Sequence, residues 1–213
     1  MERITHLKLK SPYNMLISGQ TGCGKTQFVF ELLKNLEALH ETTFERIVYA
    51  YNMQQSIYTD MLNVKANIEF TKGMPENLNL DGRPSLLILD DMMCDLAHNK
   101  NAARMFTTLR HENLSIIFLV QNLYFRSPQA TTITRNCHYL VLFPNLRDSS
   151  LIATIGRQIF PDKKNFIYES FKLATAEPYG YLFLDLKTDT PEYLRVRSSI
   201  FPQNELVVYA PSS

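Results

Sequence analysis

The sequence predicts an α/β fold, with a mainly parallel central sheet that is flanked by helices and extended by a C-terminal β-hairpin. In the N-terminal half, short apolar runs typical of strands alternate with helix-length amphipathic runs, as expected for successive β-α-β units. Residues 85–89 (SLLIL) are apolar throughout, which indicates a strand buried on both faces. Near the C-terminus, two strand-like runs flank a turn at Asp189, Thr190 and Pro191, which predicts the hairpin.

Short runs rich in apolar residues mark about five core strands in addition to the hairpin. The predicted core strands span residues 14–18 (NMLIS), 46–51 (RIVYAY), 85–89, 115–120 (SIIFLV) and 138–143 (HYLVLF). The two strands of the hairpin are expected at residues 181–186 and 193–198.

The longer amphipathic runs between these strands predict helices. The first helix, at about residues 25–36, places Phe28, Leu32, Leu33 and Leu36 on one face, which suits packing against a sheet. The other predicted helices span residues 54–62, 102–111, 148–159 and 164–174.

A length of 213 residues suits one ordinary domain with a full core and is too short for two. We therefore expect a single domain over residues 1–213, with a core at about 13–160 and a C-terminal helix and hairpin at about 161–205. Hydrophobic residues make up 45% of the chain and charged residues 20%. These values are near the globular average, which excludes a disordered, collagen-like or coiled-coil protein.

The formal net charge of +1 provides no overall attraction to nucleic acid or to a membrane, so either partner would need a local patch. The N-terminus lacks the apolar segment of a secretory signal, and the longest apolar runs are far shorter than the ~20 residues of a membrane-spanning helix. We therefore expect a soluble, intracellular protein. Cys23, Cys94 and Cys137 are widely spaced and form no CxxC pair, which argues against a zinc site or a disulfide framework.

Glycine is scarce in this chain, yet three of its seven glycines fall within six residues. They belong to the segment GQTGCGKT at residues 19–26, which matches GxxxxGK[ST] directly after a predicted strand and directly before a predicted helix. This pattern predicts a phosphate-binding loop. The expected nucleotide-binding residues are Gly19, Gln20, Thr21, Gly22, Cys23, Gly24, Lys25 and Thr26.

The residue types in this loop suit a nucleoside triphosphate. Glycines let the backbone curl so that successive N–H groups point at phosphate oxygens, and the helix N-terminus adds partial positive charge. Lys25 would reach the β- and γ-phosphates, and the Thr26 hydroxyl would bind Mg²⁺. We therefore expect ATP and Mg²⁺ as cofactors. Cys23 is either an oxidation switch or an ordinary variable loop position, and the second reading is favoured.

The strand at residues 85–89 ends in two carboxylates, Asp90 and Asp91, which is the form of a Walker B element. Asp90 would bind Mg²⁺, because a hard cation prefers oxygen ligands and a buried strand holds its carboxylate rigidly beside the phosphates. Asp91 is then the candidate general base that orients the attacking water. Two aspartates at a strand end can also serve only as a turn or a helix cap.

Gln121 follows the strand at residues 115–120, at the edge of the sheet where α/β proteins bind ligands. A polar side chain at this position can contact the γ-phosphate and the attacking water. It occupies the sensor position of NTPases that have an extra strand between the phosphate-loop strand and the Walker B strand. The predicted fold class is therefore a RecA-like (ASCE) P-loop NTPase.

An arginine often neutralises the charge of the transition state in such enzymes, in many cases from a neighbouring subunit. Arg110 lies just before the sensor strand and is the first candidate, followed by Arg135 and Arg147. Each of them is also compatible with an ordinary solvated arginine.

Five segments of the chain follow one another in a characteristic order and spacing: SGQTGCGKT, LLILDDMM, LRHENLSIIFLVQNLY, RNCHYLVLFPNLRD and EPYGYLFLDL. Together they resemble the FtsK–HerA superfamily of P-loop ATPases. More narrowly, they are similar to the short genome-packaging ATPases of poxvirus-like, adintovirus and Polinton (Maverick) elements. The resemblance covers about residues 13–186, and the tract at residues 109–124 is more specific than the phosphate loop.

The resemblance implies a ring-forming motor, a hexamer or pentamer, that threads double-stranded DNA into a preformed capsid and binds ATP between adjacent subunits. It implies a capsid or portal component as a partner, and a location in the host cell of a virus or in the virion. Gln121 would be the sensor, and Arg110 falls where the superfamily has an arginine ahead of its sensor strand. Asp91 is a departure, because the wider superfamily often has Glu there.

A motor needs only transient contacts with DNA, so the modest net charge is compatible with this partner. Candidate contact residues are Arg126 beside Tyr124 and Phe125, and the segment at residues 98–101 together with Arg104. For each of these, ordinary solvated surface is the more frequent explanation.

Two alternative functions stay open. A small nucleoside or nucleotide kinase also fits a short chain with an N-terminal phosphate loop, although the sequence shows a sensor glutamine and no arginine-rich lid. A non-catalytic assembly protein gated by NTP binding is the other, and Asp91 in place of Glu keeps it open.

Overall fold

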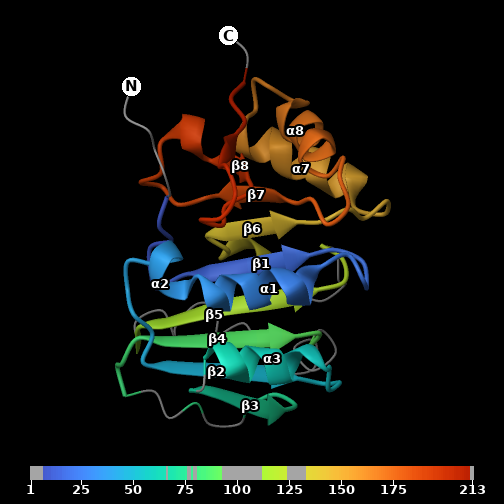
Figure 1. Ribbon diagram of the computed structural model, residues 1–213. Coiled ribbons are helices and arrows are strands. Elements are labelled where there is room, and N and C mark those ends of the chain that lie inside the picture. The colour runs from blue at the N-terminus through green and yellow to red at the C-terminus, as the bar shows by residue number, and fades with distance from the viewer. Residues whose placement is uncertain are drawn as a thin grey trace.

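Residues 7–65, 67–75, 78, 81–92, 112–123 and 133–211 are described by the computed structural model, which Figure 1 shows as a ribbon. Their strands form one nine-stranded sheet in the order β3-β2-β4-β5-β1-β6-β7-β8-β9. The strands are β1 (Asn14–Ser18), β2 (Arg46–Tyr51), β3 (Ile68–Lys72), β4 (Ser85–Asp90), β5 (Leu114–Val120), β6 (Tyr139–Leu142), β7 (Leu182–Asp185), β8 (Val196–Ser198) and β9 (Val207–Val208). The helices are α1 (Lys25–Lys34), α2 (Leu36–Leu39), α3 (Ile57–Val64), α7 (Ser149–Ile159), α8 (Phe166–Ala174) and the 3₁₀ helix η2 (Glu192–Leu194). The predicted α/β fold is confirmed.

Six strands, from β3 to β6 in the sheet order, are parallel to one another, so their carboxyl ends lie at one edge of the sheet. β5 lies between β1 and β4, as expected for a RecA-like ATPase. The register pairs Ser18 with Val120 and Asp90 with Leu119. The loops that follow β1, β4 and β5 therefore begin side by side.

Helices cover both faces of the central strands. On one face, β1 and β2 pack against α1, α2 and α3, which lie on the viewer's side of the sheet in Figure 1. On the other face, the strands pack against α7 and α8. Every residue of β4 and of β5 is buried, which confirms the prediction that the run at residues 85–89 is covered on both sides.

The predicted C-terminal hairpin is confirmed as β7 and β8, which are antiparallel and continue the central sheet beyond β6. Its second strand begins later than predicted. The prediction included Tyr193, but this residue lies in η2, and β8 begins at Val196. The Tyr193 side chain is exposed, so it makes no core contact that would hold this residue in the sheet.

Several helix boundaries differ from the predictions. The first helix ends at Lys34 and not at Leu36, because Asn35 interrupts it and donates a side-chain hydrogen bond to the Glu31 carbonyl at 2.9 Å. α3 begins at Ile57, three residues after the predicted start at residue 54. The helix predicted at residues 102–111 lies outside the described residues.

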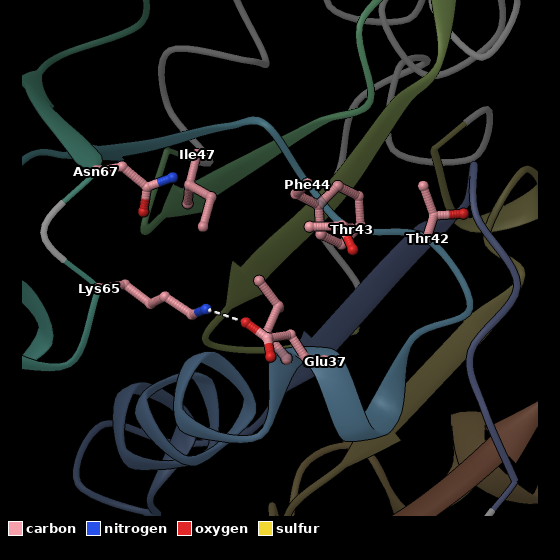
Figure 2. A pocket seen from close by; sticks show the side chains of 8 residues that line it. Glu37, Thr42, Thr43, Phe44, Ile47, Lys65 and Asn67 are labelled. Atoms are coloured by element: carbon pink, nitrogen blue, oxygen red, sulfur yellow. Dashed lines mark hydrogen bonds and ion pairs between the residues drawn. The ribbon is translucent and has the colours of Figure 1, made fainter.

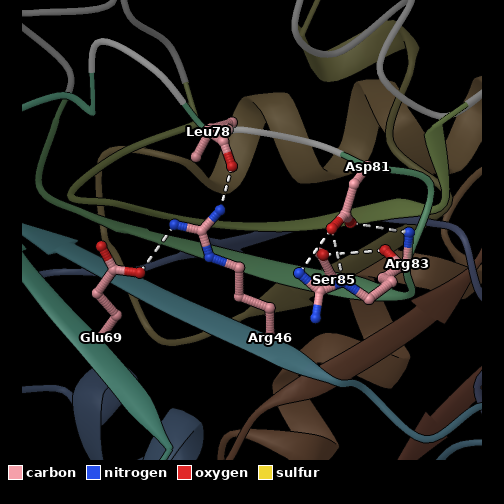
Figure 3. Close-up of polar contacts among 6 residues, drawn as sticks. All are labelled: Arg46, Glu69, Leu78, Asp81, Arg83 and Ser85. Atoms are coloured by element: carbon pink, nitrogen blue, oxygen red, sulfur yellow. Dashed lines mark hydrogen bonds and ion pairs between the residues drawn. The ribbon is translucent and has the colours of Figure 1, made fainter.

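Polar contacts hold the connection that enters β4 at the amino edge of the sheet (Figure 3). The Arg46 guanidinium donates to the Glu69 carboxylate at 2.8 Å and to the Leu78 carbonyl, so it links β2 to β3 and to the connection. Arg83 Nε donates to Asp81 across a short turn at 2.7 Å. These contacts lie far from the carboxyl edge and have a structural role.

A small pocket also lies near the amino edge, between α2, the end of α3 and the start of β2 (Figure 2). An ion pair of 2.9 Å between Lys65 and Glu37 crosses one side of it. The pocket encloses about 20 Å³, which is room for about one water molecule. A nucleotide needs far more space. Over the described part of the chain, no helix combines the length and the apolar character needed to cross a membrane.

Candidate nucleotide-binding site

The loop between β1 and α1 requires glycine at three positions. Gly22 and Gly24 have φ angles of 81° and 108°, in the left-handed region where a side chain is strained. Gly19 is restricted by space, because a Cβ there would lie 2.5 Å from the Phe143 Cβ and 2.6 Å from the Cys23 Sγ. Glycine is therefore required at Gly22 and Gly24 by the backbone conformation, and at Gly19 by the lack of space for a side chain.

Positive charge gathers where this loop enters α1. Gly24 is the N-cap of α1, no side chain caps the helix, and its first turn has no acidic residue. The N–H groups of a first helical turn lack intrahelical acceptors, and the helix dipole adds positive potential. Lys25 Nζ donates to the carbonyls of Gly19 at 2.5 Å and Gln20 at 3.0 Å, so the ammonium group lies against the same loop. This combination suits a phosphate ligand.

Cys23 is half-buried in the loop, and its backbone N–H donates to the Gln20 carbonyl at 3.2 Å. Burial raises the pKa of the Cys23 thiol. A redox switch needs the thiolate, which a low pKa favours. The surroundings of Cys23 therefore support the ordinary loop position over the oxidation switch.

Asp90 is the last residue of β4, and it is buried. Its Oδ2 atom accepts hydrogen bonds from the Tyr49 hydroxyl at 2.8 Å, the Tyr58 hydroxyl at 3.2 Å and Gln55 Nε2 at 3.3 Å. Burial raises the pKa of the Asp90 carboxyl, and the two tyrosine hydroxyls act in the opposite direction. The three donors come from β2 and from the segment around the start of α3, so they fix the orientation of the carboxyl group. Sequence reasoning did not identify them.

Asp91 and Gln121 follow β4 and β5, and the structure brings their side chains together. Gln121 Nε2 donates a hydrogen bond to Asp91 Oδ2 at 2.9 Å. Asp91 has a φ angle of 55°, and Asn52, which follows β2, donates to the Asp91 carbonyl at 3.1 Å. Both members of the pair are exposed at the carboxyl edge.

Asn145 and Asp148, which sequence reasoning missed, follow β6 at the same edge and are buried. Asn145 Nδ2 donates to the Gln121 carbonyl at 3.2 Å and to Asp148 Oδ2 at 3.0 Å. Asn145 Oδ1 accepts from Gln20 Nε2 at 3.3 Å, so this residue connects the phosphate loop with the end of β5. The signal that could have found Asn145 is the one that found Gln121: a polar side chain just beyond a buried strand.

Several of the groups described above line one cleft of about 590 Å³ at the carboxyl edge, a size within the usual range for small-molecule sites. The predicted site residues that line it are Thr21, Gly22, Gly24, Lys25, Thr26, Asp90, Asp91 and Gln121. Gly19, Gln20 and Cys23 belong to the loop but are not among the lining residues.

The oxygen donors in this cleft fit Mg²⁺ bound together with a phosphate ligand. Thr26 contributes a hydroxyl and Asp90 a carboxylate, and both line the cleft. Within the described ranges, no three His, Cys, Asp or Glu side chains cluster in a way that would hold a metal ion by themselves. Mg²⁺ is usually held by only one or two carboxylates, with phosphate oxygens and water completing its shell.

The candidate arginines are placed differently. Arg110 lies outside the described residues, as do Arg126 with its two aromatic neighbours, residues 98–101 and Arg104. Arg147 is exposed at the carboxyl edge, and its backbone N–H donates to Asn145 Oδ1 at 3.1 Å. Arg135 is exposed just before β6, at the amino edge and away from the cleft. Among the described residues that line the cleft, Lys25 carries the only positive charge.

Comparison with solved structures shows the RecA-like fold. The genome packaging NTPase B204 from Sulfolobus turreted icosahedral virus 2, in complex with ATP-gammaS, matches with a TM-score of 0.56 and 12% sequence identity over 94% of this chain and 98% of that chain. The flagellar accessory protein FlaH from Methanocaldococcus jannaschii matches with a TM-score of 0.51 and 12% identity over 93% of this chain and 90% of that chain.

Comparison of the sequence with known protein families identifies the family of this chain. No curated protein matches the chain at a significant level. The model of the family described as "Poxvirus A32 protein" matches residues 3–167. Because this match covers well over half of the sequence, the chain belongs to the poxvirus A32 protein family.

Proposed function

We propose that this protein is an ATP-hydrolysing motor that moves double-stranded DNA into a viral capsid, with the whole chain acting as one ATPase domain. The observation that carries the proposal is a cleft lined by Lys25, at the start of α1, and by Asp90, Asp91 and Gln121, at the ends of the adjacent strands β4 and β5. Membership of the A32 family and the likeness in fold to a genome packaging NTPase support the step from ATP hydrolysis to packaging.

The phosphate loop binds the triphosphate. Its backbone N–H groups and the N-terminus of α1 face the phosphate oxygens, and Lys25 contacts the β- and γ-phosphates. Thr26 and Asp90 would hold Mg²⁺, which would neutralise negative charge on the phosphate oxygens. The contacts of Asp90 with Tyr49 and Tyr58 keep its carboxylate aimed at the cleft.

Asp91 orients the attacking water and accepts its proton, and Gln121 contacts the γ-phosphate and the same water. The hydrogen bond of 2.9 Å between these two side chains supports a joint role, because it places both of them at one point of the cleft. Asp91 is exposed to solvent, so a water molecule can reach its carboxylate.

The active form is a homo-oligomeric ring, a hexamer or a pentamer, with ATP bound between subunits. Lys25 is the only cation among the described residues that line the cleft, so a second positive charge has to come from elsewhere. Arg110 is the first candidate for this trans-acting arginine, and Arg147 is the candidate at the described carboxyl edge. Duplex DNA and a capsid or portal component are the proposed partners, in an infected cell or in the virion.

The test is ATP turnover with and without duplex DNA, together with the mass of the particle in solution. We expect a ring whose hydrolysis is stimulated by DNA. Lys25→Ala should abolish turnover, while Lys34→Ala, a matched change at the exposed end of the same helix, should leave it unchanged. A phosphorylated nucleoside as the product would identify a kinase instead, and nucleotide binding without turnover would identify an assembly protein.

A further inference from the structure

The turn at residues 177–180 holds a tyrosine in a backbone conformation that tyrosine rarely adopts. Gly180 N–H donates to the Glu177 carbonyl at 3.0 Å, which closes a four-residue turn with Pro178 and Tyr179 in its centre. Tyr179 has a φ angle of 63°. Positive φ at the third position of such a turn strongly favours Gly or Asn. A bulky residue there is strained, and strain of this kind is often found at functional sites.

Burial does not compensate for this strain, because the Tyr179 side chain is 71% exposed. The turn is nevertheless tightly built. A Cβ on Gly180 would lie 2.4 Å from the Ala174 carbonyl oxygen, so the backbone of the turn packs closely against the end of α8. A strained, exposed ring on a rigid turn is well suited to contact something outside the chain.

The ring of Tyr179 lies beside the phosphate loop. A Cβ on Gly24 would be 3.2 Å from Tyr179 Cδ1, which places the ring next to the N-cap residue of α1. Gly24 also lines the phosphate cleft, whereas Tyr179 does not. The ring therefore adjoins the loop, outside the cleft that contains Asp91 and Gln121.

Tyr181, the first residue after the turn, anchors this arrangement to α1. The ring of Tyr181 packs edge-to-face on Phe28 of α1, with 4.9 Å between the ring centroids, and lies 5.6 Å from Phe143. The Tyr181 hydroxyl accepts a hydrogen bond from the Ile200 N–H at 3.0 Å. The turn is thus fixed to the helix that begins at the phosphate loop, and the position of Tyr179 relative to Gly24 is fixed with it.

We propose that the exposed ring of Tyr179 stacks on the base of the nucleotide whose phosphates bind the loop at residues 19–26. This proposal rests on the proposed nucleotide-binding function and adds the recognition of the base. A nucleotide places its base one sugar away from its phosphates, and an aromatic ring next to the loop offers it a flat partner. Stacking uses the π face that every base has, so it selects for a base without reading its hydrogen-bonding edge.

The test compares ATP with inorganic tripolyphosphate, which has the phosphates but no base, in calorimetric binding experiments. Removing a stacking ring typically weakens binding by about 5- to 150-fold. We expect Tyr179→Ala to weaken ATP binding about tenfold and to leave tripolyphosphate binding unchanged. Tyr179→Phe, which keeps the aromatic face, should bind ATP like the unmodified protein. Tyr193→Ala, the control, removes another exposed tyrosine at the opposite edge of the sheet and should bind both ligands normally.

A second variant separates a role in binding from a role in folding. Tyr179→Gly relieves the positive φ, so it should raise the melting temperature of the nucleotide-free protein while weakening ATP binding as much as the alanine change does. Unchanged ATP affinity in Tyr179→Ala overturns the proposal. If Tyr179→Ala weakened the binding of ATP and of tripolyphosphate equally, the proposal would also be overturned, because the ring would then act only through the phosphate loop.

The remaining outcomes are equally distinct. Loss of self-association by Tyr179→Ala, with ATP affinity intact, would assign the ring to contact with another copy of the chain and overturn base stacking. If the unmodified protein binds neither ATP nor tripolyphosphate, the proposed function itself fails, and the stacking role falls with it.

Discussion

The side-chain amide of Gln121 donates a hydrogen bond to Asp91 Oδ2 at 2.9 Å, which joins the residues that follow β5 and β4. The contact depends on the sheet order, because β4 and β5 are adjacent parallel strands that end at the same edge. Asp91 also has the positive φ angle of 55°, a conformation that Asp and Asn tolerate better than most residues. The carboxylate that we propose as the general base is therefore held by the residue that we propose as the sensor.

Asp91→Asn should separate ATP binding from ATP hydrolysis. Asparagine keeps the size and tolerates the positive φ angle, but its amide cannot accept the proton of the attacking water. We expect turnover to fall by about 100-fold or more, with the dissociation constant for ATP changed by less than about threefold. Asp162→Asn, a change at an exposed aspartate after α7, is the control. Normal turnover in Asp91→Asn would remove Asp91 as the base.

Asn145→Ala should weaken both the fold and the coupling between the phosphate loop and the sensor strand. The change removes the hydrogen bonds of Asn145 to Gln20, to the Gln121 carbonyl and to Asp148. Losing these hydrogen bonds should lower the free energy of unfolding by about 1–3 kcal/mol, which denaturant titration measures. Turnover measured well below the melting temperature should fall too. Full activity there would limit Asn145 to a structural role.

Asn145→Asp tests the contact between residues 145 and 148 through the pH dependence of stability. The new carboxyl group would lie beside Asp148, whose pKa burial already raises. Two adjacent carboxylates raise each other's pKa in the folded state. A raised folded pKa gives stability that is present at low pH and lost as the pH rises through it. We therefore expect the variant's loss of stability relative to the unmodified protein to be smallest below pH 4 and clearly larger near pH 7. A difference that is independent of pH would contradict this reading.

The sequence predicted most of the fold because the central strands are covered on both faces. β4 and β5 are apolar and buried along their whole lengths, so periodicity and length identify them without further information. β3 was missed, because only Ile68 of its five residues is buried and the strand lies at the edge of the sheet. β9 was missed for a similar reason, since both of its residues are exposed.

The sequence predicted only some residues of the candidate site, because the others lie far from the motifs along the chain. The phosphate loop is continuous, so one motif was enough to find it. The partners of Asp90 are not continuous with it: Tyr49 and Tyr58 precede it by 41 and 32 residues and reach it only through the packing of β2 and α3. The φ angle of Tyr179 likewise leaves no pattern in the sequence.

Gly19→Ala and Gly22→Ala should fail for different reasons. At Gly19 the obstacle is contact, since the added methyl would lie 2.5 Å from the Phe143 Cβ, an atom next to the backbone that cannot move aside. At Gly22 the added methyl would have no atom within 4 Å, and the obstacle is the φ angle of 81°. We expect losses in unfolding free energy of about 1–3 kcal/mol at Gly19 and about 1–2 kcal/mol at Gly22.

Asparagine distinguishes the two causes, because it tolerates positive φ but is larger than alanine. Gly22→Asn should recover part of the stability that Gly22→Ala loses, whereas Gly19→Asn should be worse than Gly19→Ala. Thermal or denaturant unfolding measures all four variants. If the alanine and asparagine variants ranked in the same order of stability at both positions, backbone strain at Gly22 and crowding at Gly19 could not be the separate causes.

His40 should make the fold sensitive to mild acid. Its ring is buried, with Nδ1 2.8 Å from the Leu36 carbonyl oxygen and Nε2 2.8 Å from the Tyr13 hydroxyl. A carbonyl only accepts, so Nδ1 carries the proton and Nε2 accepts from the tyrosine. Burial lowers the pKa of His40 to about 4, from an ordinary value of 6.5, and the charge of Lys8 acts in the same direction.

A lowered folded pKa means that the unfolded chain binds more protons between these two values. The contribution of His40 is therefore fully present above pH 6.5 and is lost as the pH falls toward 4. Its size is on the order of 3 kcal/mol at 25 °C. His40→Gln removes the titration while keeping a polar side chain. Denaturant titrations should find this variant less stable at pH 7, with the two proteins converging as the pH falls toward 4. If the free energies of unfolding of the two proteins differed by the same amount at every pH, His40 would not titrate in this range.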